Sequence, residues 1–185
     1  MAEAFTNKLV RAAGIVSTTD STAAIGANAT AITNIQTANL HVGDLVVNQN
    51  FRAGAKIRTI TNSTSVVVDR ESTNTSATTS QIVKFLGVTT AFTSSGTEKS
   101  ILIGGTFANL TENDINVSVE IFDNSSAGTA NSTSLLASDI PIPSGSSFVI
   151  SEAGKTVLEQ NDQVKIYCDT ANAVDVTLAI LSGVS

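Results

Sequence analysis

Aromatic residues are scarce in this chain, and two reactive residue types are nearly absent. Tryptophan does not occur, aromatic residues make up 4% of the sequence, and there is one histidine, His41, and one cysteine, Cys168. A single cysteine excludes an intrachain disulfide, so packing or oligomerisation must supply the stability. A single histidine excludes a metal site with two or more imidazoles and leaves one candidate base for a serine-histidine-aspartate arrangement.

Charged residues are also few, at 14% of the chain, and the net charge is -6. Nucleic-acid binding needs a cluster of Lys and Arg that contacts phosphates. The densest basic stretch, Arg52, Lys56 and Arg58, is dilute. No run of about 18 apolar residues occurs, and no apolar segment precedes a signal cleavage site near the N-terminus. We therefore expect a soluble protein that is made in the cytoplasm, with no nucleic-acid and no membrane partner.

Thr, Ser, Asn, Ala and Val recur throughout the 185 residues, of which 42% are hydrophobic. β-branched residues favour strands, and Ser and Asn satisfy the backbone of turns. This mixture is typical of short strands joined by polar turns, so we expect an all-β protein. The chain is long enough for one sizeable core or two small ones, and we expect two small domains.

The only two prolines, Pro141 and Pro143, lie in the stretch LLASDIPIPSGSSFVI, residues 135–150. Each proline fixes its own φ near about −65° and moves the preceding residue toward β or polyproline geometry. We therefore expect residues 139–143 to be extended, as an edge strand or as a crossing between two sheets. A turn at 144–147 and a short strand at 148–150 should follow.

The first half of the chain divides into an arm and a small domain. Residues 1–19 are expected to be an N-terminal arm. Phe5 and Leu9 are four residues apart, which allows a short helix, but an apolar arm equally often docks on a neighbouring subunit. Residues 20–86 are expected to be a small β-barrel or sandwich. Its expected strands are 31–35, 44–47, 56–60, 65–68 and 81–86, with a surface loop at 71–80.

The second half consists of a linker and a more regular domain. Residues 87–97 are small and polar and form the expected linker. Residues 98–185 contain segments in which every second residue is apolar, which predicts strands with one face in a core. The expected inward residues are Ile115, Val117, Val119 and Ile121; Val164, Ile166 and Cys168; and Val174, Val176, Leu178 and Ile180. Further strands are expected near 100–107 and 156–158, with a polar loop at 123–134. This number of strands predicts an antiparallel β-sandwich.

No residue pattern predicts a catalytic, cofactor-binding or metal-binding site. His41 lies in a turn-forming sequence, NLHVGD, and no nucleophile elbow accompanies it. Cys168 falls on the apolar side of a strand, where a buried thiol is expected rather than a nucleophile.

Two sets of residues suggest a binding site, for calcium or for phosphate, but neither has the complete pattern. The Asx pairs at 113–114 and 123–124, and Asp169 with Asn172, offer oxygen ligands to calcium, but they lack the regular spacing of a calcium loop and fit turns. Gly104 and Gly105 follow a strand without the lysine and helix of a phosphate loop, and they predict a bulge or a close backbone crossing.

The second half of the chain contains four segments with a recognisable pattern: SILIGG, INVSVEIFD, LLASDIPIPSGSSFVI and GKTVLEQNDQVKIYCDTANAVDVTLAILSGV. They resemble a β-sandwich module of small virion structural proteins of tailed bacteriophages, including marine and cyanobacterial ones. In the first half, VGDLVVNQNFRAGAKIRTITNSTSVVVD is similar to small β-repeats of phage tail and neck proteins.

The resemblance implies a non-enzymatic head decoration, neck or collar, or tail component that assembles as a symmetric oligomer. Its partners would be copies of itself and other virion proteins in the capsid, neck or tail, without a cofactor. It would be made in the host cytoplasm and reside in the virion. The alternative is a carbohydrate-binding or host-attachment module of a tail or surface protein. Sugar sites usually present aromatic platforms, and Tyr167 is the one aromatic residue expected to supply one from an outward strand face.

Overall fold

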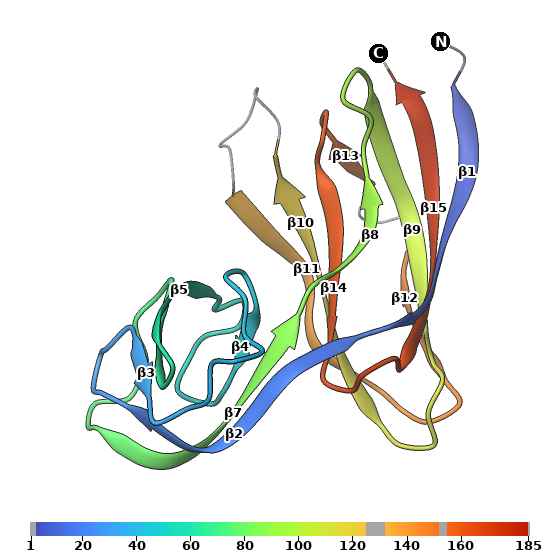
Figure 1. Ribbon diagram of the computed structural model, residues 1–185. Helices are drawn as coiled ribbons and strands as arrows, with labels where there is room; N and C mark the ends of the chain where they lie inside the picture. The colour runs from blue at the N-terminus through green and yellow to red at the C-terminus, as the bar shows by residue number, and fades with distance from the viewer. Residues whose placement is uncertain (1–2, 125–131, 152–154, 185) are drawn as a thin grey trace. The chain divides into compact units, whose positions relative to one another are not determined.

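The computed structural model describes residues 3–124, 132–151 and 155–184 (Figure 1), so most of the loop expected at 123–134 lies outside the described residues. The expected all-β class is confirmed, since the described residues form antiparallel sheets and contain no helix. The chain divides into two compact units. Unit 2 comprises Ile15–Val88, and unit 1 comprises Met1–Gly14 together with Thr89–Ser185. Unit 2 is therefore an insertion into the chain of unit 1.

This division differs from the expected order of arm, domain, linker and domain. Residues 1–19 contain β1 (Ala4–Ala13), which pairs with β15 (Val174–Val184) of the same chain, and the beginning of β2 (Ile15–Ile25). Residues 87–97 contain β8 (Thr89–Thr93), which pairs with β14 (Gln163–Cys168). Both segments make their hydrogen bonds with strands that are distant in sequence, and local composition carries no signal for such pairing.

Unit 2 is a six-stranded antiparallel sheet with the order β4-β7-β2-β3-β6-β5. Besides β2, its strands are β3 (Ala31–Thr33), β4 (Leu45–Val47), β5 (Ile57–Asn62), β6 (Ser65–Val68) and β7 (Thr78–Gly87). Further backbone bonds join β4 to the start of β5: Val46 N donates to Ala55 O at 2.8 Å, and Ile57 N donates to Asp44 O at 3.0 Å. These bonds join the two strands that stand at the ends of the strand order.

The five strands expected between residues 20 and 86 are present as β3 to β7, while β2 was not expected. Its central residues are Ser and Thr, and its hydrophobic alternation is interrupted by shifts of register against β7. Strand β7 begins at Thr78 rather than at residue 81, because Thr78 pairs with Ile25 of β2. The core of the unit is built from buried residues on these strands, among them Ile25, Ile32, Ile57, Val66 and Phe85.

Unit 1 consists of two antiparallel sheets. One has the order β1-β15-β9-β12, with β13 also paired to β9, and we call it sheet A. The other has the order β11-β10-β14-β8, and we call it sheet C. The remaining bounds are β9 (Lys99–Asn109), β10 (Ile115–Asp123), β11 (Ser132–Ile142), β12 (Ser147–Ile150) and β13 (Thr156–Leu158).

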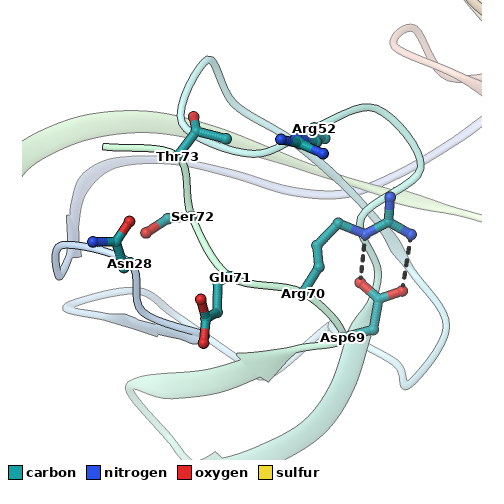
Figure 2. Close-up of a pocket in the computed structure, with 7 residues that line it drawn as sticks. All are labelled: Asn28, Arg52, Asp69, Arg70, Glu71, Ser72 and Thr73. Atoms are coloured by element: carbon teal, nitrogen blue, oxygen red, sulfur yellow. Dashed lines mark hydrogen bonds and ion pairs between the residues drawn. The ribbon is translucent and has the colours of Figure 1, made fainter. Parts of the chain in front are cut away.

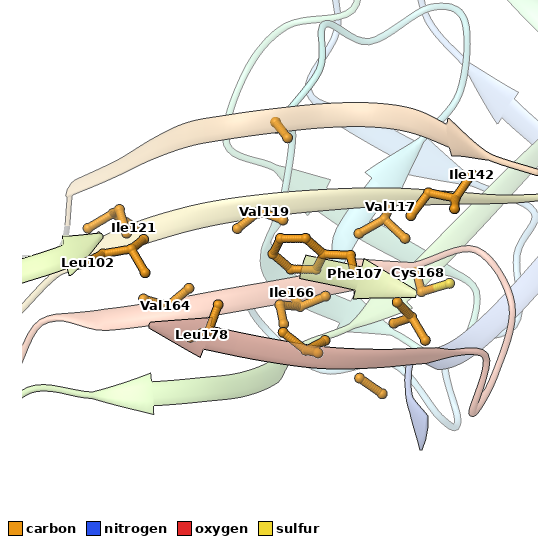
Figure 3. Packing of buried hydrophobic residues seen from close by; sticks show 14 of the residues in the cluster. Leu102, Phe107, Val117, Val119, Ile121, Ile142, Val164, Ile166, Cys168 and Leu178 are labelled. Atoms are coloured by element: carbon orange, nitrogen blue, oxygen red, sulfur yellow. The ribbon is translucent and has the colours of Figure 1, made fainter. Parts of the chain in front are cut away.

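One hydrophobic core lies between the two sheets (Figure 3). Phe107 and Leu178 enter it from sheet A, and Val119, Ile121 and Ile166 enter it from sheet C. Every residue that the alternation predicted to point inward from β10, β14 and β15 is buried. A core shared by two antiparallel sheets is the arrangement of a β-sandwich, as expected for this half of the chain.

The proline stretch crosses between the sheets at their edges. Strand β11 is an edge strand of sheet C, β12 pairs only with β9 of sheet A, and a turn in which Ser146 N donates to Pro143 O at 3.1 Å connects them. The expected crossing is therefore confirmed. The expectation of an extended chain from residue 139 is wrong at Asp139, which has φ 52° and lies at an irregularity of the β10–β11 ladder. Its backbone N–H donates to Ser118 Oγ at 2.9 Å, and Asp tolerates this conformation better than most residues.

Candidate functional site

His41 and Cys168 lie where the sequence placed them. The imidazole of His41 is 79% exposed and belongs to a turn in which Asp44 N donates to His41 O at 3.1 Å. The buried carboxylate of Asp44 accepts a hydrogen bond of 2.9 Å from His41 N, so its role in this turn is to satisfy the backbone. Cys168 is fully buried in the core of unit 1, as expected for a packing thiol.

Two of the loop carboxylates that offered oxygen ligands to calcium, Asp114 and Asp169, accept hydrogen bonds from backbone groups. Asp114 Oδ1 accepts from Ser144 N at 3.2 Å, and Asp169 Oδ1 accepts from Asn116 N at 2.9 Å. Both bonds hold a loop against a neighbouring segment of unit 1. Within the described ranges, no group of three or more His, Cys, Asp or Glu side chains is arranged to hold a metal ion.

The Gly104–Gly105 pair lies inside β9, next to a shift of register between β9 and β15. A Cβ at Gly104 would approach the carbonyl oxygen of Ile150 to 2.7 Å, and one at Gly105 would approach Leu178 Cδ2 to 2.8 Å. Such contacts are closer than side chains tolerate. The prediction of a bulge with a close backbone approach is confirmed.

Tyr167 does not provide the outward platform that was expected. It is 1% exposed, and its hydroxyl donates a hydrogen bond of 3.1 Å to Oε1 of the buried Glu120. The alternation of β14 correctly places it on the opposite face from Ile166 and Cys168. That face is nevertheless buried at this point, as the neighbouring Glu120 of β10 shows, since it is 1% exposed as well. Tyr167 therefore cannot stack against a sugar from this position.

The largest hollow described in unit 2 has a volume of about 650 Å³ and is polar (Figure 2). Its lining residues come from three segments that are distant in sequence: Asn28, Arg52, and Asp69, Arg70, Glu71, Ser72 and Thr73. Arg70 forms a two-pronged ion pair with Asp69, with Nε to Oδ1 and Nη2 to Oδ2 both at 3.2 Å. This ion pair neutralises the charge of Arg70, which is one of the two arginines that line the hollow.

Ser72 fixes the rim of this hollow and is not arranged as a nucleophile. Its buried hydroxyl accepts from Ala29 N at 3.0 Å and donates to Gly26 O at 2.9 Å. No histidine lines the hollow, and both hydrogen bonds of the Ser72 hydroxyl go to the backbone. The exposed Arg52 and Asn28 can donate hydrogen bonds to a polar molecule, whereas the Thr73 hydroxyl donates to Asn50 O at 3.2 Å and can only accept. The lining contains no aromatic ring.

A second surface feature is apolar and lies on unit 1. The side chains of Phe5 and Leu9 on β1 are 77% and 70% exposed. Both occupy the same face of the strand, because strand side chains alternate with a period of two. The sequence indicated this apolar pair, but it left open whether the pair lies on a short helix or on an arm that docks on a neighbouring subunit. Its placement on a sheet depends on pairing with β15, which no local pattern indicates.

None of the described residues forms a helix long and apolar enough to cross a membrane. Comparisons with protein-family models, with curated protein sequences and with solved structures found no match to the chain.

Proposed function

We propose that the protein is a non-enzymatic structural component of a tailed-bacteriophage virion, assembling as a symmetric oligomer on the capsid, neck or tail. The exposed apolar side chains of Phe5 and Leu9 carry this proposal, because a strand that displays large apolar groups to solvent needs a partner surface to cover them. The resemblance of the proline stretch to virion proteins supports it further. That stretch forms the crossing between the two sheets of unit 1, so it belongs to the framework of the sandwich.

The partners in this proposal are copies of the chain itself and other virion proteins. Copies on a symmetric particle can be held by many modest contacts, which suits a chain whose polar groups are occupied with backbone bonds. Nucleic acid is not proposed as a partner, because the net charge is -6 and repels phosphate. The protein would be made in the host cytoplasm and incorporated into the virion.

The second candidate is carbohydrate binding or host attachment, and the polar hollow of unit 2 is the observation that favours it. Arg52 and Asn28 present donors that sugar hydroxyls can use. The hollow lacks an aromatic platform, so the affinity for a single sugar should be low.

Peptide mass spectrometry and immunogold labelling of purified particles, from a phage that encodes the chain, test the main proposal. We expect a stoichiometric number of copies per particle and gold at one structural location. Absence of the chain from particles that are infectious and intact would overturn the proposal. Binding to a glycan array that is lost in Arg52→Ala, combined with absence from particles, would favour the second candidate instead.

A further inference from the structure

The outer face of sheet A carries two rows of residues that cross the strands. Phe5 of β1 pairs with Leu181 of β15, Leu181 pairs with Ile101 of β9, and Ile101 pairs with Val157 of β13. All four are apolar and lie outside the buried core of the sandwich. The row therefore runs from β1 across two inner strands to the opposite edge of the sheet (Figure 1).

The second row lies four residues farther along β1. Leu9 pairs with Thr177 of β15, Thr177 pairs with Thr106 of β9, and Thr106 pairs with Val149 of β12. Apolar side chains occupy both edges of this row, and threonines occupy its middle. Between the two rows lie Asn7, Ala179 and Gly104, which are small or uncharged.

Charged residues flank this surface at its two ends. Arg11, two residues after Leu9, and Asp175 are at one end, and Glu3, two residues before Phe5, and Lys99 are at the other. Asp175 Oδ1 accepts a hydrogen bond from Ala12 N at 2.8 Å, and Lys99 Nζ forms an ion pair of 3.0 Å with Glu159 Oε1. No charged residue lies within the rows themselves. The outer face of a sandwich sheet is normally its polar, solvated face, so this pattern is inverted.

We propose that the outer face of sheet A is a self-association surface, on which a second copy of this chain packs the same face about a two-fold axis. This inference rests on the proposed function, because it names the surface through which the symmetric oligomer is held. The rows of Phe5 and Leu9 from one copy lie against the same rows of the other, sheet upon sheet, at the separation of about 10 Å that packed sheets adopt.

The charge of the chain indicates that a second copy, rather than a basic partner, covers the outer face of sheet A. Two chains with a net charge of -6 repel each other, and they approach at lowest cost through a surface whose rows carry no charged residue. A basic partner would find no acidic group within the rows. A second copy supplies an equally apolar and equally uncharged surface.

The size of the face also fits a dimer. The order β1-β15-β9-β12 gives four neighbouring strand positions, with about ten residues along β1. With strands about 4.8 Å apart and about 3.4 Å per residue, the footprint is on the order of 650 Å², before side-chain relief is added. Stable interfaces bury about 800 Å² on each partner, so the sheet face alone approaches that area.

Sedimentation velocity of the purified full chain over a range of concentrations tests the proposal. We compare the wild type with the double variant Phe5→Lys and Leu9→Lys, and with Val149→Lys at the opposite edge of the same face. The matched control is Val42→Lys, an exposed valine of unit 2 with 65% exposure, which changes the charge in the same way on another surface. Circular dichroism verifies that each variant is folded.

We expect the wild type and Val42→Lys to sediment as dimers or larger even oligomers. We expect the face variants to be monomeric, with the dissociation constant raised at least about 30-fold, because each buries an unpaired charge in an apolar contact. If Phe5→Lys with Leu9→Lys disturbs β1, Val149→Lys provides the same test from β12.

Three outcomes would overturn the proposal. These are a wild type that is monomeric at all concentrations, folded face variants that keep the wild-type oligomer, and a Val42→Lys variant that dissociates as strongly as the face variants do. Co-sedimentation of a monomeric wild type, but not of the face variants, with phosphatidylcholine vesicles would assign the face to a lipid surface and also overturn it. The proposed function is tested separately, by the presence of the chain in particles. A monomeric chain that is found in virions would contradict only the self-association surface. A dimeric chain that is absent from virions would contradict only the proposed function.

Discussion

The amide nitrogen of Asn109 donates a hydrogen bond of 2.9 Å to the carbonyl oxygen of Ile142. Asn109 is the last residue of β9 in sheet A, and Ile142 is the last residue of β11 in sheet C, so one side chain joins the two sheets of the sandwich. The same side chain also donates to Asn113 O at 2.7 Å and accepts from Thr111 N at 2.7 Å. Its polar atoms are thus fully used inside the fold.

Replacing this asparagine should weaken unit 1. Asn109→Ala leaves the buried carbonyl of Ile142 without this donor, and we expect the free energy of unfolding to fall by about 1 to 3 kcal/mol. Urea denaturation followed by the fluorescence of Tyr167, the only tyrosine in a chain without tryptophan, reports on unit 1 alone. The matched control is the exposed Asn113→Ala, whose described bonds use only its main chain and which should cost less than about 0.5 kcal/mol. Equal losses in the two variants would contradict the prediction.

Gly14 should tolerate no side chain. Its φ is +121°, and an added Cβ would overlap the carbonyl oxygen of Thr170 and lie 3.1 Å from Cys168 Cβ. Gly14→Ala should therefore destabilise unit 1 by at least about 2 kcal/mol more than Gly145→Ala does. Gly145 has φ +68°, in the left-handed region that alanine reaches at modest cost, and no atom within 4 Å of an added Cβ, so it lacks both the overlap and the less accessible φ of Gly14. Urea denaturation followed by the fluorescence of Tyr167 measures the free energy of unfolding of both variants. Similar losses of free energy in the two variants would refute the steric argument.

The inserted unit should be removable. Gly14 N lies 3.4 Å from Thr89 Oγ1, so the two ends of unit 1 that flank the insertion are close together. Ile15 pairs with Gly87, so the ends of unit 2 are adjacent as well. We expect a chain in which a short glycine linker replaces residues 15–88 to keep a cooperative unfolding transition, and residues 15–88 to fold on their own. A deletion of residues 15–93, which also removes β8 from sheet C, should abolish the transition. Loss of cooperativity in the shorter deletion would show that the units depend on each other.

Pro141 should protect the edge of sheet C. It lies in edge strand β11 opposite Asn116, where a residue with an N–H adds a donor to the strand. We expect Pro141→Thr to remain folded and to self-associate at lower protein concentration than the wild type, as measured by light scattering. Pro143→Thr, in the turn after β11, is the control and should behave as the wild type does. Equal aggregation of both variants would rule out a specific role at the edge.

Strands whose pattern is local could be predicted from the sequence. In β10, β14 and β15 every second residue is apolar, and the core of unit 1 follows directly from that alternation. The insertion of unit 2 could not be predicted, because it depends on the pairing of β1 with β15, whose register brings together residues such as Ala4 and Ser182. Strand β2 was missed because its central Ser and Thr residues give no apolar alternation, although threonine favours strands.

The surface features required the structure for a similar reason. The hollow of unit 2 gathers residues near 28, 52 and 69–73, and nothing in the sequence indicates that these segments meet. The side of the strand on which Tyr167 lies could be predicted, but its burial depends on the neighbouring strands. The apolar rows of sheet A likewise become visible only when the register across β1, β15, β9 and β13 is known.

The order in which the strands are made has a consequence for assembly. A ribosome adds about 5 to 20 residues per second, so β15 follows β1 by a time on the order of 10 to 35 seconds. Unit 2 is contiguous in sequence and can fold within this interval, while β1 waits for its only partner strand. Leu181 joins Phe5 only after β15 has emerged. A nascent or truncated chain therefore lacks the complete rows, so under the proposed self-association only chains in which β15 is complete would present this surface to one another.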